Sequence, residues 1–393
     1  MKKFLIACLQ LLFCFDLSFG QSLSLKRLDG TSLSSATADS IILQLMERAK
    51  VTGLALAILN NNKIAYTKAY GLKNSTTKEA LDTSTVLYGA SFSKAVFAFL
   101  NLLLVQEGIL SLDKPLYQYL DKPLPFYEGY SELAGDDRWK LITARTCLSH
   151  TTGFPNWRFL NARTGAFEAD GKLAIYFTPG SKYAYSGEGL ALLQMVIEKI
   201  TGKNLQDLAE TKLFTPIGLK HTSYIWQPHF ENNFAYGHLE NGEMIGKKKR
   251  KKAGGAGSLE TTIADYARFI EYVMQGKGLN KKTKQLMLTP QIRIHSAYQF
   301  PTISELTTTS YESIRLSYGL GWGILKSNYG KAFFKEGHDD GWQHYNINFS
   351  EKGISIIIMT NSSNGEKIFK EILDKLIGDR FTPWEWERYT PYN

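Results

Sequence analysis

The sequence is poor in cysteine, with three in 393 residues. Cys8 and Cys14 fall in an N-terminal segment with the pattern of an export signal, so the mature chain would keep Cys147 alone. One cysteine cannot form an intramolecular disulfide, which excludes the small disulfide-stapled class of exported proteins. With 44% hydrophobic residues, the chain can instead bury a core large enough for two lobes.

Metal-ligand spacing and long apolar segments are also missing. The seven histidines show no spacing typical of a zinc or other metal site, so we predict neither a metal nor a cofactor. After the N-terminal segment, the longest apolar run covers residues 95–105, well short of the roughly 20 residues that cross a bilayer. This run is apolar on nearly every face, which is typical of a helix inside a protein core.

Residues 1–20 have the pattern of a secretory signal peptide. Lys2 and Lys3 form a charged start, residues 4–15 are mostly apolar, and residues 18–20 offer small side chains for cleavage near Gly20. We therefore expect an exported chain, periplasmic or secreted, whose mature part is a single domain over residues 21–393.

Charge of one sign is concentrated in one place. The net charge is +9, and six of the positive charges lie in the run Lys247–Lys252. Turn-forming and glycine-rich residues flank the run, which predicts a solvated basic loop. An exported protein has no use for a nuclear signal, so nucleic acid is not an expected partner. The alternative is a contact with an anionic envelope surface or substrate.

The segment Ser91-Phe92-Ser93-Lys94 carries a candidate chemistry. A helix is expected to begin here, and positions i and i+3 of a helix share a face, so Lys94 can reach Ser91. A serine hydroxyl becomes a good nucleophile when a neighbouring base takes its proton. Lysine can be that base if burial or nearby positive charge lowers its pKa. The competing interpretation is a helix-capping serine beside a solvated lysine.

The order of the expected elements predicts an α+β fold. Apolar periodicity predicts helices over residues 35–50, 189–200 and 365–377, and a further helix from Thr262. Short apolar or alternating runs predict strands over residues 54–59, 64–70, 318–325, 332–336, 344–349 and 354–360. Strands near both ends of the chain, with helices between them, predict one antiparallel sheet built from the two termini and flanked by helices.

Four further segments follow the Ser91 segment in a recognisable order. They are residues 142–155 with His150-Thr151-Thr152-Gly153, residues 185–193 beginning Tyr185-Ser186-Gly187, residues 254–265, and residues 337–341. Together with residues 82–94 they resemble the class C β-lactamase and penicillin-binding serine hydrolase family, with its DD-peptidase and esterase relatives. The resemblance implies a β-lactamase/DD-peptidase-like fold, with an α/β lobe from residues 21–90 and 255–393 and a mainly helical lobe from residues 91–254.

The resemblance also implies roles for individual residues. Ser91 would be the acylated nucleophile, Lys94 its base, and Tyr185 a second base whose pKa is lowered by Lys94. The backbone N–H groups of Ser91 and Gly341 would form the oxyanion hole. His150 would shape a loop by bonding backbone rather than react.

Two departures from the family pattern concern substrate binding. Gly187 stands where the family usually has an asparagine that bonds a substrate amide. His338, Asp339 and Asp340 stand where many members have Lys-Thr-Gly or His-x-Gly on the strand along the cleft. Asp340 would place a carboxylate where a glycine normally admits substrate. Trp157 either walls the cleft or packs in the core.

These residues predict a metal-independent serine hydrolase acting through an acyl-enzyme at Ser91. The substrate would be a small molecule or peptide: a β-lactam, a D-alanyl peptide or an ester, with Gly187 and Asp340 arguing against an efficient class C β-lactamase. The alternative is a penicillin-binding or envelope-peptide-binding protein that kept the fold without turnover. The sequence does not indicate the oligomeric state.

Overall fold

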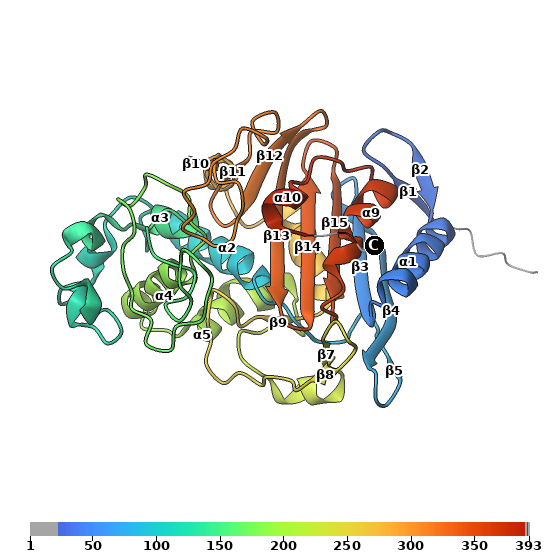
Figure 1. Ribbon diagram of the computed structural model, residues 1–393, viewed down its shortest axis with the longest axis horizontal. Coiled ribbons are helices and arrows are strands. Elements are labelled where there is room, and N and C mark those ends of the chain that lie inside the picture. The colour runs from blue at the N-terminus through green and yellow to red at the C-terminus, as the bar shows by residue number, and fades with distance from the viewer. Residues whose placement is uncertain (1–22, 390, 392–393) are drawn as a thin grey trace, which may run out of the picture.

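We describe the protein from a computed structural model, which covers residues 23–389 and 391 (Figure 1). The expected signal segment, residues 1–20, lies outside the described residues. None of the described helices is long and apolar enough to span a membrane.

A nine-stranded antiparallel sheet forms the centre of the described chain. From one edge to the other it contains β10 (Ile292–Arg293), β11 (Ser317–Tyr318), β12 (Gly323–Ser327), β13 (Gly330–Asp339), β14 (Trp342–Phe349), β15 (Ile354–Thr360), β3 (Gly53–Asn60), β4 (Lys63–Asn74) and β5 (Glu79–Ala80). Three two-stranded ribbons accompany it: β1 (Ser24–Lys26) with β2 (Ser32–Ser34), β6 (Leu87–Tyr88) with β9 (Glu260–Thr261), and β7 (Gly237–His238) with β8 (Met244–Ile245).

The helices surround this sheet and build a second lobe. The α-helices are α1 (Ser35–Ala49), α2 (Phe92–Gln106), α3 (Ala144–Leu148), α4 (Gly187–Thr201), α5 (Leu205–Ala209), α6 (Thr215–Ile217), α7 (Ile263–Met274), α8 (Lys281–Met287), α9 (Glu366–Leu376) and α10 (Trp384–Glu387). Short 3-10 or π turns add η1 (Leu116–Tyr119), η2 (Leu124–Phe126), η3 (Ser131–Leu133), η4 (Asp137–Leu141), η5 (Glu210–Phe214) and η6 (Pro228–Asn232). The segments that are green in Figure 1 form the mainly helical lobe at one side of the sheet.

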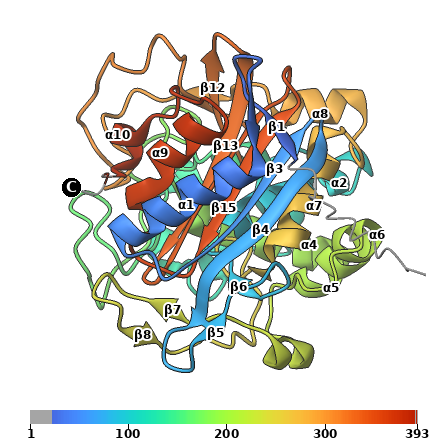
Figure 2. The same ribbon diagram turned by 90° about the vertical axis from the view of Figure 1, so that its right-hand side faces the viewer.

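The two ends of the chain meet in the sheet, as predicted. Strand β3 pairs with β15, so that Ile58 lies opposite Ile356. Both faces of β3 are covered: Leu54, Leu56 and Ile58 pack in one core with α1 and α9, whereas its alternate residues pack in the other core with α2 and α7. Figure 2 shows α1 and α9 in front of the sheet and α7 behind it. Burial on both faces explains why β3 is a continuous apolar run.

Two expectations about local structure are corrected. The strand predicted over residues 318–325 is two strands, β11 and β12, joined by a turn at Gly321, whose φ of +87° favours glycine. The basic run is not solvated throughout, because the Lys247 side chain is 2% exposed and its Nζ lies 2.6 Å from Glu260 Oε2. Glu260 is fully buried on β9, and a buried carboxylate needs a partner of opposite charge.

Arg250 is the second inward-facing cation of this run. Its guanidinium approaches Glu260 Oε1 at 3.4 Å and lies 3.7 Å from the centre of the Tyr88 ring. The exposed members of the run are Lys248, Lys249, Lys251 and Lys252. Charge composition alone could not show which cations of the run face inward and which are exposed.

Candidate active site

Ser91 lies directly before helix α2. The side chain makes no capping hydrogen bond, so the capping interpretation is wrong. Instead, Ser91 Oγ lies 2.8 Å from Lys94 Nζ. The preceding residue, Ala90, has a φ of +44°, a strained conformation for a residue with a Cβ and one that clusters at functional sites. No acceptor for the Ser91 N–H is found among the described residues, so this donor is free at the helix N-terminus.

Lys94 is buried rather than solvated, with 1% of its surface exposed. Its Nζ also lies 2.6 Å from the carbonyl oxygen of Ala256. Burial, followed by the positive charge of Lys335, holds the pKa of Lys94 well below its usual value. A neutral amine between a carbonyl acceptor and a serine hydroxyl can donate to the first and accept a proton from the second.

Tyr185 reaches the same point from the segment before α4, and its partner was not predicted. Lys335 Nζ on β13 donates to Tyr185 Oη at 2.9 Å and to Glu336 Oε1 at 2.7 Å. The structure thus brings Lys335 to the tyrosine hydroxyl, while the predicted cation Lys94 lies over the Tyr185 ring, with its Nζ 4.8 Å from the ring centre. Lys335-Glu336-Gly337 keeps the first and third residues of the Lys-Thr-Gly pattern. That spacing was the available signal, but the histidine three residues later obscured it.

The expected lowering of the Tyr185 pKa is wrong. Burial, followed by the carboxylate of Glu336, raises the pKa of Tyr185 well above its usual value, and a hydrogen bond with Ser91 opposes this shift. Tyr185 is therefore a protonated phenol at rest. Of the two predicted bases, Lys94 is the one whose environment suits proton abstraction, and Tyr185 suits proton relay.

Strand β13 approaches the segment before the nucleophile at Gly337, not at Asp340. A Cβ on Gly337 would lie 3.0 Å from the carbonyl oxygen of Gly89, a tight contact that glycine avoids. Asp340 lies outside the Ser91 cavity and lines a neighbouring hollow of 340 Å³. The structure also does not bring Gly341 to Ser91, because the Gly341 N–H donates to Ser363 Oγ at 2.7 Å.

At Gly187, Asn156 and Trp157 occupy the space that a side chain would need. A Cβ there would lie 2.7 Å from the Asn156 carbonyl oxygen and 2.8 Å from the Trp157 indole. The Gly187 N–H donates to Asn156 Oδ1 at 3.0 Å, which directs the Asn156 amide nitrogen the other way. Asn156 and Trp157 both line the cavity with Ser91, so Trp157 is a cleft wall.

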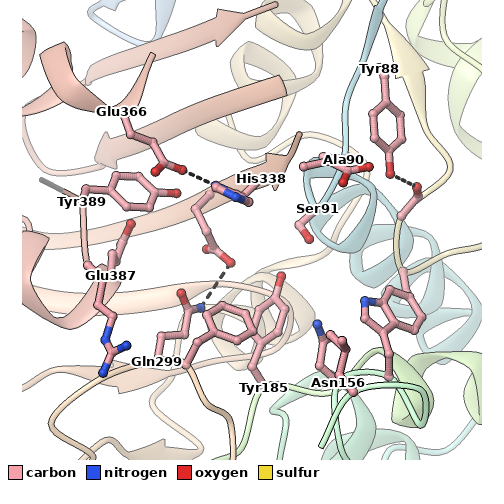
Figure 3. A pocket seen from close by; sticks show the side chains of 18 of the residues that line it. Tyr88, Ala90, Ser91, Asn156, Tyr185, Gln299, His338, Glu366, Glu387 and Tyr389 are labelled. Carbon is pink, nitrogen blue, oxygen red and sulfur yellow. Dashed lines mark hydrogen bonds and ion pairs between the residues drawn. The ribbon is translucent and has the colours of Figure 1, made fainter. Parts of the chain in front are cut away.

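The cavity beside Ser91 has a volume of 710 Å³ (Figure 3). Its aromatic lining comprises Tyr88, Trp157, Phe159, Tyr185, Phe300 and Tyr389. Its charged lining comprises Glu336, Asp339, Glu366, Glu387, Lys248, His338 and Arg388. Figure 3 shows Ser91 and Asn156 on one side and Glu387 and Tyr389 on the opposite side.

His338 faces this cavity and is held by a partner from another element. Its Nδ1 lies 2.5 Å from Glu366 Oε1 at the start of α9, and its side chain is 56% exposed. Burial alone would lower the pKa of His338, but the bonded Glu366 carboxylate outweighs burial and the pKa is raised. His338 and Asp339 therefore line the cleft as predicted, but they do not contact Tyr185 through a hydrogen bond of the described structure.

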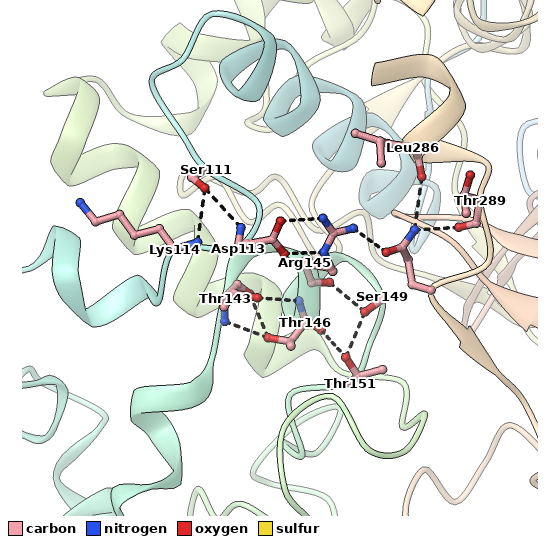
Figure 4. A network of polar contacts seen from close by, with 11 residues as sticks. Ser111, Asp113, Lys114, Thr143, Arg145, Thr146, Ser149, Thr151, Leu286 and Thr289 are labelled. Atoms are coloured by element: carbon pink, nitrogen blue, oxygen red, sulfur yellow. Dashed lines mark hydrogen bonds and ion pairs between the residues drawn. The ribbon is translucent and has the colours of Figure 1, made fainter. Parts of the chain in front are cut away.

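His150 shapes the loop under Tyr185, as predicted. Its Nδ1 accepts from the Ser186 N–H at 3.1 Å, and its carbonyl accepts from Ala184 N at 2.8 Å. Burial holds its pKa well below the usual value, so the ring is neutral. The preceding helix α3 is fixed by a polar network in which Arg145 binds Asp113 with two nitrogens (Figure 4). Arg145 also donates to Gln291 Oε1 at 2.6 Å, which joins the two lobes.

The site lies between the sheet and the helical lobe. It combines a serine at a buried helix N-terminus with two buried lysines and a tyrosine, an arrangement that can support serine-based acyl transfer. No group of three or more potential metal ligands is found among the described residues. The family profile described as Beta-lactamase matches residues 38–377. The chain belongs to this family.

Relatives of several kinds resemble the chain at low identity. A penicillin-binding protein of Bacillus subtilis (strain 168) is 24% identical over 83% of this chain and 72% of its own length. Esterase EstB of Burkholderia gladioli is 27% identical over 50% of this chain and 53% of its own length. Among solved structures, an octameric penicillin-binding protein homologue from Pyrococcus abyssi matches with a TM-score of 0.70. That match covers 90% of this chain and 80% of the other, at 20% identity.

Proposed function

We propose that the protein is a serine hydrolase that forms an acyl-enzyme at Ser91. The observation that carries this proposal is the 2.8 Å distance between Ser91 Oγ and the buried Lys94 Nζ, because a lysine with a depressed pKa can take the hydroxyl proton. The relatives named as penicillin-binding protein and esterase support the same class of reaction.

The geometry supports the following sequence of steps. Ser91 Oγ bonds to the substrate carbonyl carbon while Lys94 Nζ takes its proton. The Ser91 N–H stabilises the resulting oxyanion, together with a main-chain N–H from residues 335–339 of β13. Strand β12 pairs with β13 only as far as Phe334, so this segment borders the cleft. The carbon–leaving group bond then breaks, and the proton held by Lys94 passes to the leaving group through Tyr185. A water molecule then bonds to the acyl carbon and gives its proton to Lys94 through Tyr185. The bond between this carbon and Ser91 Oγ breaks, Ser91 Oγ takes the proton back from Lys94, and the carboxylic acid leaves.

The cleft favours an acyl compound with an apolar part. Trp157 and Phe159 stack with ring centroids 6.0 Å apart, and form an apolar wall next to the Asn156 amide. Asn156 takes over the amide recognition that Gly187 cannot provide. We infer that esters and amides are better substrates than β-lactams, whose carboxylate would meet Glu336 in place of the threonine of Lys-Thr-Gly.

Intact-mass spectrometry with a fluorophosphonate and with labelled penicillin tests the proposal. We expect an adduct on Ser91 and none on the Ser91→Ala variant. Ser93→Ala is the matched control, because Ser93 Oγ is buried against the Ala90 carbonyl and the Leu259 N–H and should not react. An unlabelled wild-type protein, or a labelled Ser91→Ala variant, would contradict the proposal. A permanent adduct with no ester or peptide turnover would favour the alternative of a binding protein.

Export is a second, separate proposal. It rests on the charged, apolar and small-residue order of residues 1–20. The N-terminal sequence of protein recovered from outside the producing cytoplasm should begin near Gln21. Recovery of the uncut chain from the cytoplasm alone would contradict it.

A further inference from the structure

The end of the cleft opposite Asn156 contains hydrogen-bonding groups that the protein leaves unused. Glu387 is 5% exposed, and its Oε2 has no hydrogen-bond partner among the described residues. Tyr389 is 9% exposed, and its hydroxyl is likewise unpartnered within the described part of the chain. Both residues line the Ser91 cavity. Buried polar groups are nearly always bonded, so two exceptions on one wall point to a ligand.

A third acceptor lies between this wall and the catalytic groups. Glu336 Oε1 accepts from Lys335 Nζ at 2.7 Å and from Gln299 Nε2 at 3.2 Å, and the dashed line from Gln299 in Figure 3 marks the second bond. Its Oε2 makes no hydrogen bond within the described residues and is left for the cleft. Glu336 is only two hydrogen bonds from the Tyr185 hydroxyl, through Lys335. A group bound there is therefore close to the scissile carbonyl.

The chemistry of these groups suits a hydrogen-bond donor of positive charge. Burial and Glu336 raise the pKa of Glu387 well above its usual value, so this carboxyl stays neutral until a cation enters. The rings of Tyr389, Phe300 and Tyr185 stand around the same space, and aromatic faces attract ammonium groups. The cations of the cleft are engaged or at its rim. Lys335 is shared by Glu336 and Tyr185, His338 is held by Glu366, Arg388 lies over Tyr298, and Lys248 is exposed.

We propose that the substrate presents a primary amine to the space between Glu336 and Glu387, so that the site acts on acyl compounds with a free amino group, such as the amino terminus of a peptide or an amino-acid ester. The amine is bound by Glu336 Oε2 and Glu387 Oε2 while Ser91 faces the neighbouring carbonyl. The substrate class rests on the proposed serine chemistry, but the amine subsite itself does not.

Isothermal titration calorimetry with the Ser91→Ala protein tests the amine subsite separately from the serine chemistry, because binding needs no turnover. The probes are phenylalaninamide, N-acetylphenylalaninamide and N-succinylphenylalaninamide. We expect the free amine to bind at least about tenfold more tightly than either acylated form, the size of one charge-assisted hydrogen bond. Absence of binding by phenylalaninamide, or equal or tighter binding of the acetyl or succinyl form, would overturn the amine subsite.

Variants locate the subsite. Ser91→Ala/Glu387→Gln should reduce the preference for the free amine by about tenfold, with Glu336 Oε2 left as the second acceptor, and Tyr389→Phe on the Ser91→Ala background should reduce it less. The matched control is Glu385→Gln, which changes an exposed carboxylate two residues away on the same helix and should keep the preference. A preference that survives in Glu387→Gln and Tyr389→Phe would overturn the assignment. Failure of Ser91 to form an adduct in the wild-type protein would contradict the proposed hydrolase function but not the amine subsite.

Discussion

Two buried lysine–glutamate pairs in this molecule have nearly the same geometry and different surroundings. Lys335 Nζ lies 2.7 Å from Glu336, and Lys247 Nζ lies 2.6 Å from Glu260. The first lysine also donates to Tyr185 beside the nucleophile. The second is enclosed by Arg250 and by the ring of Trp342, with its Nζ 4.7 Å from the ring centre. Burial of a charged pair therefore does not distinguish the two places. They differ in the third group that contacts the lysine, which is the Tyr185 hydroxyl for Lys335 and the Trp342 ring for Lys247.

Removal of the lysine from the cleft pair should have the largest effect. In Lys335→Met the Tyr185 hydroxyl loses its donor, and Lys94 loses the neighbouring charge that lowers its pKa. We expect kcat/KM for an ester to fall by about 10²–10⁴-fold, the usual contribution of a proton-transfer group. Steady-state kinetics on folded protein measures this. A fall of less than about tenfold would contradict a role for Lys335 in proton transfer.

The same change in the other pair should mainly reduce stability. Lys247→Met leaves Glu260 buried beside Arg250 alone, and breaking a buried pair costs about 3–5 kcal/mol of unfolding free energy. Urea unfolding followed by circular dichroism measures the loss. Under conditions where the variant is folded, kcat/KM should stay within a few-fold of wild type. An equal fall of kcat/KM in Lys247→Met and Lys335→Met would contradict the prediction that only the Lys335 pair takes part in proton transfer.

A change to the opposite cleft wall gives a smaller effect that depends on neither pair. Gly187→Asn forces a side chain into the space held by Trp157 and the Asn156 carbonyl. Overpacking of this kind costs about 1–3 kcal/mol, and the displaced indole should raise KM for aromatic esters more than it lowers kcat. In Gly187→Asn/Trp157→Ala the unfolding free energy should recover in part. An unchanged unfolding free energy in Gly187→Asn would contradict this prediction, because it would show that Trp157 and Asn156 move aside without a loss of stability.

The smallest expected effect is a pH shift at the rim of the cleft. The Glu366 carboxylate raises the pKa of His338, so the stabilisation from this pair is complete below the ordinary histidine pKa of about 6.5 and is lost as pH rises through the raised value. NMR titration of the His338 ring should show a midpoint above 6.5 that moves down in Glu366→Gln. A midpoint that is the same in both proteins would mean that Glu366 does not hold the ring in solution.

Much of the fold followed from local patterns in the sequence. The sheet from both termini was predictable because β3 and β15 are short apolar runs, β14 alternates between polar and apolar residues, and α1 and α9 have clear helical periodicity. Ser91, Lys94 and Tyr185 were predictable because their segments carry a resemblance, and the structure places Lys94 against Ser91. The turn at Gly321 was not predicted, because the residues on both sides of it are equally apolar and were assigned to one strand.

The rest depended on contacts between distant segments. Asn156 binds the backbone of Gly187, 31 positions later in the chain, and no local signal connects the two. Lys247 looked solvated because its neighbours are lysines, and only the approach of Glu260 draws it inside. The Tyr185 pKa went in the unexpected direction because its burial, which a sequence does not display, and then the Glu336 carboxylate raise it, and a hydrogen bond with Ser91 opposes them only in part.

The pairing of β3 with β15 has a consequence for how the active protein is made. The strand that carries Ile58 leaves the ribosome early, whereas its partner with Ile356 leaves it late. Contacts between residues so distant along a chain form slowly, because a long loop must close first. Lys335 joins the site only when that late part of the chain docks. With the proposed chemistry, a nascent chain that already contains Ser91 should not react until Lys335 docks, so acylation by a serine probe would report the completion of folding.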